Sequence, residues 1–198
     1  LFVDPASVPK RQALQLGLGA GSLTKFCNRV VRMKTTAIEL NPQVLAACRL
    51  WFKLPAHDAR LHVVLADAAR EVKKEIYLGS VDALQVDLYD HEAAAPVLDD
   101  TDFYSQCRQL LTAQGCMVVN LFGRSSSYAE SVEKICAAFG EDAIWAFKPT
   151  REGNAIVLAQ RTASRPKREE LIAAATAIED KWGLPALKWL KVFKPLTK

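Results

Sequence analysis

Three glycines near the start of this 198-residue chain have a spacing typical of a nucleotide-binding loop. Gly17, Gly19 and Gly21 follow an apolar run and precede a segment with helical spacing. Glycines there let the backbone approach a ligand closely, and the following helix points its free N–H groups at that ligand. A dinucleotide-binding loop would have its third glycine one position later, where Ser22 stands. The spacing therefore favours an adenosyl sulfonium over a pyrophosphate; a tight turn without a ligand is the alternative.

Four carboxylates follow at the ends of expected strands. Glu39 ends the strand expected over 35–40, Asp67 follows the one over 61–65, and Asp87 and Asp90 follow the one over 81–86. Open α/β sheets bind ligands at the carboxyl ends of their strands, and an acid after the second strand can accept hydrogen bonds from ribose hydroxyls. Each acid alone could be a solvated loop residue. Together with the glycines they predict a nucleotide site at one edge of a sheet.

The elements that must position these residues alternate between strand and helix patterns. Strands are expected over 13–18, 35–40, 61–65, 81–86, 116–122, 143–148 and 155–161. Helical patterns separate the first five, among them one over 22–31 and one that starts at Asn41-Pro42, an N-cap residue followed by proline. This indicates parallel strands with helical crossovers. Only residues 149–154 join the last two strands, so these form an antiparallel hairpin. The sequence predicts an α/β fold: a Rossmann-like, doubly wound, mostly parallel seven-stranded sheet with an antiparallel C-terminal hairpin.

The chain is expected to consist of an α/β domain over 1–162 and a helical extension over 163–198. Leu171, Ala175, Ile178 and Trp182 form a helical stripe in the extension. We expect this amphipathic helix and its continuation over 186–193 to cover the sheet or a subunit interface, as in a homodimer. Binding to a partner or a membrane surface is the alternative.

Composition argues against several other classes. The net charge is +4, from 26 basic and 22 acidic residues, without the basic stripe of a nucleic-acid binder. The five cysteines form no C-x-x-C pair, and the three histidines show no metal-ligand spacing, so we expect no metal site. No apolar run is long enough to span a membrane and no signal peptide is visible. The scattered cysteines suit a reducing compartment, so we expect a cytoplasmic protein.

The motifs resemble the spermidine synthase (polyamine aminopropyltransferase) family, whose members have the fold of class I S-adenosylmethionine-dependent methyltransferases. The resemblance extends over residues 13–161. Its marks are Leu-Gly-Leu-Gly-Ala-Gly at 16–21, Ala-Ile-Glu-Leu-Asn-Pro at 37–42, Ala-Asp-Ala at 66–68, the segment 81–90, the Phe-Tyr pair at 103–104 and the hairpin 150–160. It implies a transferase of polyamine biosynthesis that moves an aminopropyl group from decarboxylated S-adenosylmethionine to a small amine.

The resemblance also implies roles for individual residues. Glu39 would hold the ribose and Asp67 the adenine. Asp87 would orient and deprotonate the attacking amine, and Asp90 would bind its charge. The implied cofactor-binding residues are Gly17, Gly19, Ala20, Gly21, Glu39, Leu40, Asp67 and Ala68, and the implied catalytic residues are Asp87, Tyr89 and Asp90. An alkyl ammonium has a pKa near ~10.4, so it must lose a proton before it can attack.

Some positions depart from the family pattern. Ala20 stands where the family usually has an aspartate that favours the free amine of the decarboxylated donor, and Leu88 and Tyr89 replace small hydroxyl residues. Without that aspartate, intact S-adenosylmethionine is not repelled. Three hypotheses follow: an aminopropyltransferase, a methyltransferase that uses the intact cofactor, and a non-catalytic homologue that serves as a binding or interaction module.

Overall fold

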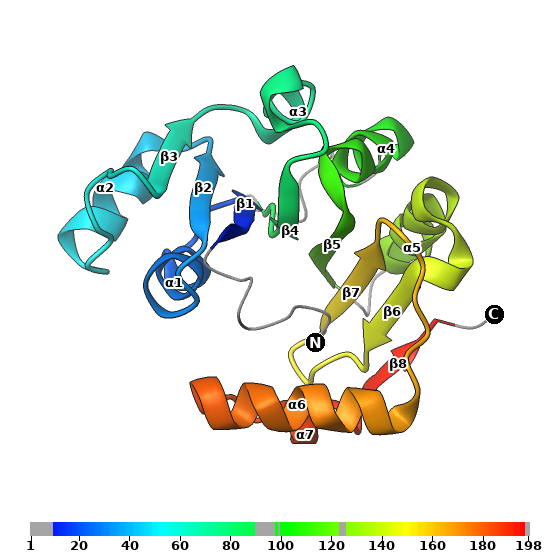
Figure 1. The fold of residues 1–198 in the computed structure, drawn as a ribbon. Coiled ribbons are helices and arrows are strands. Elements are labelled where there is room, and N and C mark those ends of the chain that lie inside the picture. Colours follow the sequence, from blue (N-terminus) through cyan, green and yellow to red (C-terminus); the bar gives the residue numbers. More distant parts are fainter. Residues whose placement is uncertain (1–9, 90–97, 99, 123–125, 197–198) are drawn as a thin grey trace.

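An eight-stranded sheet forms the centre of the protein (Figure 1). The structure, a computed structural model, describes residues 10–89, 98, 100–122 and 126–196. The strand order is β3-β2-β1-β4-β5-β7-β6-β8. The strands are β1 (Gln12–Leu16), β2 (Lys34–Glu39), β3 (Leu61–Leu65), β4 (Val81–Val86), β5 (Leu111–Phe122), β6 (Ile144–Phe147), β7 (Asn154–Gln160) and β8 (Phe193–Pro195). Strands β1 to β5 are parallel, and β7, β6 and β8 are joined by antiparallel pairing, so the predicted α/β fold is confirmed.

Helices cover both faces of this sheet. They are α1 (Ser22–Lys25), α2 (Pro42–Leu50), α3 (Ala68–Glu71), α4 (Thr101–Leu110), α5 (Ser126–Phe139), α6 (Arg168–Trp182) and α7 (Ala186–Trp189). Single helical turns lie over η2 (Phe26–Val30), η3 (Glu75–Tyr77) and η5 (Glu141–Ala143). In Figure 1, α3, α4 and α5 lie on one face, and α1 and α6 on the other. Helices therefore pack on both faces of the sheet, as in a doubly wound fold.

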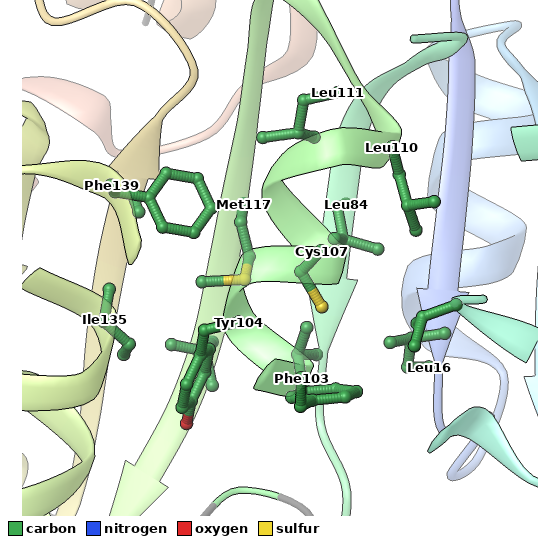
Figure 2. Close-up of a cluster of buried hydrophobic side chains, with 14 of the residues drawn as sticks. Leu16, Leu84, Phe103, Tyr104, Cys107, Leu110, Leu111, Met117, Ile135 and Phe139 are labelled. Atoms are coloured by element: carbon green, nitrogen blue, oxygen red, sulfur yellow. The ribbon is translucent and has the colours of Figure 1, made fainter. Parts of the chain in front are cut away.

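The largest core lies between the sheet and α4 and α5 (Figure 2). Helix α4 buries Phe103, Tyr104, Cys107 and Leu110, a spacing that places them on one helical face. These side chains meet Met117 and other strand residues whose side chains point to the same face of the sheet. Each fully buried side chain of this size contributes about 1.5–3 kcal/mol. This core holds β4 and β5 side by side, and both strands end at the predicted site.

Two helices that start at the carboxyl edge, α2 and α4, are capped by short polar side chains. Asn41 accepts a hydrogen bond from the Gln43 amide, and Pro42 occupies the first turn of α2, as the sequence predicts. Asp100 caps α4 in the same way by accepting from the Asp102 amide. These caps set the residues at which the chain leaves each strand and turns back over the sheet.

The C-terminal extension contains a strand that the sequence did not predict. After α6 and α7, β8 pairs antiparallel with β6 and gives the sheet one strand more than the seven expected. Phe193 explains this addition, because its ring stacks on Trp145 at 5.0 Å between centroids and lies 4.7 Å from the Phe147 ring. Trp182, at the end of α6, packs against a small cluster around Ala13 on the face that α1 covers. In the described part of the chain, no helix has the length and apolar character needed to cross a membrane.

Candidate nucleotide and transfer site

The predicted site residues lie in one row across the carboxyl ends of the parallel strands. Leu16 of β1 pairs with Ile38 on one side and with Val86 on the other, and Val86 pairs with Val119 of β5. The residues that come next along these strands are Glu39, Gly17, Asp87 and Asn120, in that order across the sheet. The pairing continues at this level, because the Gly17 amide donates to the Ile38 carbonyl and the Asp87 amide donates to the Leu16 carbonyl, both at 2.9 Å.

Gly17 is the position at which only glycine fits. Its φ is +93°, and a Cβ built there would lie 2.1 Å from the carbonyl oxygen of Asp87. No other residue type can adopt this conformation and this contact without moving β4. The close approach of Gly17 to Asp87 therefore brings the glycine loop directly against the candidate catalytic residue.

The rest of the glycine loop turns over the start of α1. Gly19 and Gly21 also have positive φ, at +51° and +68°, and a Cβ at Gly19 would meet no atom within 4 Å. Ala20 between them is exposed. The Cys48 thiol donates to the Gly19 carbonyl at 2.9 Å. Burial, and to a smaller extent the nearby Glu39 carboxylate, raises the pKa of Cys48, so its sulfur stays protonated and keeps this contact.

Glu39 ties the glycine loop to the end of β2. One carboxylate oxygen accepts from the Leu18 amide at 3.0 Å, and the other accepts from the Asn41 amide at 2.8 Å. An ionised carboxylate has about four acceptor positions, so each oxygen keeps one for a ligand hydroxyl. The half-buried side chain is thus oriented from both sides before any ligand is bound.

Apolar and acidic side chains lie next to Glu39. Leu40 is 72% exposed and Leu65, which is the partner of Glu39 in β3, is 50% exposed. Asp67 caps α3 through one oxygen, which accepts from the Ala69 amide at 2.8 Å, and its second oxygen lies 3.9 Å from the exposed Arg70 guanidinium. Ala68 is buried in the core, so its side chain is turned away from the edge. Exposed leucines beside two carboxylates suit a flat, partly polar ring attached to a sugar.

Asp87 is held by a residue that the sequence analysis missed. The side-chain amide of Asn120 donates to one Asp87 carboxylate oxygen at 3.0 Å. The Tyr89 hydroxyl donates its proton to a hydrogen bond with the Asn120 carbonyl at 3.0 Å, so it does not donate to Asp87. Burial first, and then the negative charge of Asp87, raises the pKa of Tyr89. Asn120 is the one polar residue in the apolar run 116–122, and that pattern was the available signal.

The structure therefore brings Gly17, Glu39, Asp87 and Asn120 together, with Asp67 beyond the end of the neighbouring β3. Asp90 lies outside the described residues. Two cavities lie away from this edge: one is lined mainly by α5, and the other by residues near the start of β5 and the end of β7. Within residues 10–89, 98, 100–122 and 126–196, no cluster of three or more His, Cys, Asp or Glu side chains could hold a metal ion.

The chain was compared with known proteins. No family model matches it. It is 32% identical to a polyamine aminopropyltransferase of Chromobacterium violaceum over 176 residues, which is 88% of this chain and 66% of that protein. It is 27% identical to a polyamine aminopropyltransferase of Neisseria meningitidis over 186 residues, which is 93% of this chain and 68% of that protein. The chain thus spans about two thirds of the length of these relatives.

Solved structures share the fold. Human methyltransferase-like protein 13 in complex with SAH superimposes with a TM-score of 0.80 at 22% identity, over 93% of this chain and 88% of that one. A probable spermidine synthase from Corynebacterium glutamicum superimposes with a TM-score of 0.72 at 19% identity, over 93% of this chain and 66% of that one. The methyltransferase fold and the resemblance to the aminopropyltransferases are both confirmed.

Proposed function

We propose that this chain, a spermidine synthase-like protein with the methyltransferase fold, is a transferase that moves an aminopropyl group from decarboxylated S-adenosylmethionine to a small amine. The row of strand-end residues carries the proposal. Glu39 and Asp87 flank Gly17 on the two neighbouring strands. Adjacent strands are about 4.8 Å apart, so the backbones of Glu39 and Asp87 are roughly 10 Å from each other. One carboxylate can hold the ribose while the other reaches the carbon beside the sulfonium.

The donor would bind along the β2 and β3 side of the row. Glu39 would accept from the ribose hydroxyls with its two remaining acceptor positions, while the Leu18 and Asn41 amides keep the carboxylate in place. The exposed leucines, Leu40 and Leu65, offer an apolar surface for the adenine ring. Asp67 stands at the end of that surface, where an exocyclic amino group can donate to it.

The acceptor would bind on the β4 side. A cationic amine is attracted to Asp87, whose carboxylate can take the proton that blocks the nitrogen lone pair. The nitrogen then attacks the propyl carbon attached to sulfur. The new N–C bond forms as the C–S bond breaks, and the bonding pair of electrons stays on sulfur. The sulfonium becomes a neutral thioether, and the carboxylate carries the proton until solvent removes it.

The names of the relatives support the same reaction. The relatives from Chromobacterium violaceum and Neisseria meningitidis are both named polyamine aminopropyltransferase, and this chain aligns with about two thirds of each. We also propose a cytoplasmic location and a homodimeric assembly for this chain. The five free cysteines suit a reducing compartment, and an assembly contact could involve the exposed parts of the C-terminal helices.

A methyltransferase is the second candidate, and Ala20 favours it. The residue is exposed in the glycine loop and carries no charge. An aspartate at this point would repel the carboxylate of intact S-adenosylmethionine by roughly 4 kcal/mol at 4 Å and an effective dielectric constant of 20. Because alanine has no such effect, the loop can accept the intact donor as readily as the decarboxylated one.

The mass of the thioether by-product distinguishes the candidates. The protein is incubated with each donor and a panel of diamines, and the products are measured by mass spectrometry. Aminopropyl transfer leaves the methyl group on sulfur as methylthioadenosine, whereas methyl transfer from the intact donor leaves S-adenosylhomocysteine. We expect methylthioadenosine together with an amine lengthened by one aminopropyl group. Firm donor binding without any thioether product would reject aminopropyl transfer, and it would favour a methyltransferase with another kind of acceptor or the binding module.

A further inference from the structure

We infer that Asn120 is a positioning residue that holds the Asp87 carboxylate in the orientation required for transfer. The inference rests on the proposed function of the same site, because it assumes that Asp87 meets the acceptor amine. Asn120 is not among the residues that the family resemblance implied. It follows from the contacts at the ends of β4 and β5.

Asp87 is held at three points. Its amide donates to the Leu16 carbonyl at 2.9 Å, and its carbonyl lies against Gly17, where no Cβ could fit. These two contacts restrain only the main chain. The third contact is the 3.0 Å hydrogen bond from the Asn120 side-chain amide to one carboxylate oxygen. The Asp87 side chain is exposed, and within the described part of the chain this hydrogen bond is the contact that restrains its rotation.

The orientation of the Asn120 amide is itself determined by Asp87. An ionised carboxylate only accepts hydrogen bonds, so the NH2 group of the amide must face it. The amide oxygen then points away from Asp87, into a buried place where it has no hydrogen-bond partner among the residues that the structure describes. Leaving a buried acceptor unpaired costs stability. The apolar Val118, two residues earlier on the same side of β5, has no such cost.

This cost indicates a role in activity. One hydrogen bond to an exposed carboxylate stabilises the protein less than an unpaired buried oxygen destabilises it. An apolar residue at this position would leave no buried oxygen unpaired. What the amide adds is a fixed carboxylate. With one oxygen bound to Asn120, the other is left for the amine, and a displacement of about 1 Å at such a point can lower a rate 100-fold.

The Tyr89 hydroxyl supports the same arrangement. It donates to the main-chain carbonyl of Asn120 at 3.0 Å and so ties the segment after Asp87 to β5. Asp87 and Asn120 are therefore joined both through their side chains and through the neighbouring tyrosine. The two strand ends form one unit, in which a change at Asn120 is transmitted to the carboxylate.

The test replaces the amide and measures kcat, the dissociation constant of the donor and the melting temperature. Asn120→Leu keeps the branched shape at Cγ and removes the donor. We expect kcat to fall on the order of 10- to 100-fold, with donor affinity within twofold of the native protein and no loss of melting temperature. Gln85→Leu is the matched control. Gln85 lies on the same side of β4 as Asp87, but its side-chain amide contacts Cys27 and not Asp87, so this variant makes the same amide-to-apolar change without affecting the carboxylate.

A second variant separates positioning from a structural role. Asn120→Asp has the same shape as the native residue, yet in its ionised form it cannot donate and places a second negative charge beside Asp87. A positioning role predicts that kcat at neutral pH decreases in the order Asn, Leu, Asp. A structural requirement for a polar residue predicts that Asp is better than Leu. If the Leu variant does not fold, Asn120→Ala is compared with Asn120→Asp in the same way.

The results of these experiments distinguish a wrong role for Asn120 from a wrong proposed function. If the native protein transfers a group and the Leu variant keeps kcat within twofold, the inference is wrong and the proposed function stands. The order Asn, Asp, Leu also overturns the inference alone. If the native protein transfers nothing from either donor to any amine, the proposed function is rejected and the role of Asn120 falls with it.

Discussion

Replacing Glu39 by alanine should weaken the binding of any adenosyl ligand without unfolding the protein. The native carboxylate accepts from the Leu18 amide at 3.0 Å and from the Asn41 amide at 2.8 Å, and it keeps acceptor positions for the ribose. A hydrogen bond to a charged group contributes about 1.5–3 kcal/mol. Losing the ribose contact should therefore raise the dissociation constant by roughly 10- to 150-fold, since each ~1.4 kcal/mol is a factor of ten.

The same substitution has a smaller effect on stability. The Leu18 and Asn41 amides lose their partner, but Glu39 is only half-buried, so water can replace part of what is lost. A loss of about 1 kcal/mol corresponds to a fall of roughly 2–4 °C in melting temperature for a chain of this size. Affinity should thus change far more than stability.

Glutamine is an informative second substitution. Its side chain has one acceptor oxygen, whereas the two amides that contact Glu39 need one oxygen each. The NH2 group of glutamine must therefore face one backbone N–H group, and the glycine loop or the end of β2 has to move. We expect Glu39→Gln to lose affinity as well, although its shape is nearly that of glutamate.

The measurement is calorimetric titration of each variant with intact and decarboxylated S-adenosylmethionine, together with thermal unfolding. Glu75→Ala serves as the control, because this exposed acid lies before the start of β4, at the other end of that strand. A Glu39→Ala protein that binds both donors as tightly as the native one would refute the ribose assignment. A melting temperature lowered by more than about 10 °C would show that the carboxylate mainly serves the fold.

Three further outcomes are expected. Gly17→Ala should lower the melting temperature and abolish donor binding, because its Cβ would lie 2.1 Å from the Asp87 carbonyl oxygen; a native-like melting curve would contradict this. Ala20→Asp should shift donor preference toward the decarboxylated form by at least tenfold in competition titrations, and a native protein that already prefers that form a hundredfold would show that Ala20 has little weight. Asp87→Asn should reduce the transfer rate on the order of 10²–10⁴-fold in the mass-spectrometric assay while donor affinity stays unchanged; activity within twofold of native would rule out Asp87 as the base.

Several local features could be predicted from the sequence because each depends on neighbours in the chain. The strands β3 and β4 have the bounds 61–65 and 81–86 that apolar patterning indicated. The Asn41-Pro42 pair starts α2, since an N-cap followed by proline needs no tertiary partner. The helix expected over 22–31 is less regular: α1 ends at Lys25, and the chain continues in the wider turn η2.

The C-terminal strand shows where local patterns do not suffice. Segment 186–193 was expected to continue as a helix, and α7 does form at its start. Phe193, however, is 4% exposed and stacks between the rings of Trp145 and Phe147 on β6, more than forty positions earlier in the chain. A three-residue strand has little propensity of its own. Its pairing depends on an aromatic surface that exists only after the sheet has formed.

The site divides in the same way. The sequence by itself determined that glycines and carboxylates stand at successive strand ends, because strand length and side-chain alternation are local properties. Only the tertiary structure decided which of them meet. The register of β1 with β2 and β4 places Gly17 between Glu39 and Asp87, and the register of β4 with β5 places Asn120 beside Asp87. Register is set by how the apolar side chains of neighbouring strands pack together on the buried faces of the sheet, so no pattern within a single strand could show that these side chains lie together.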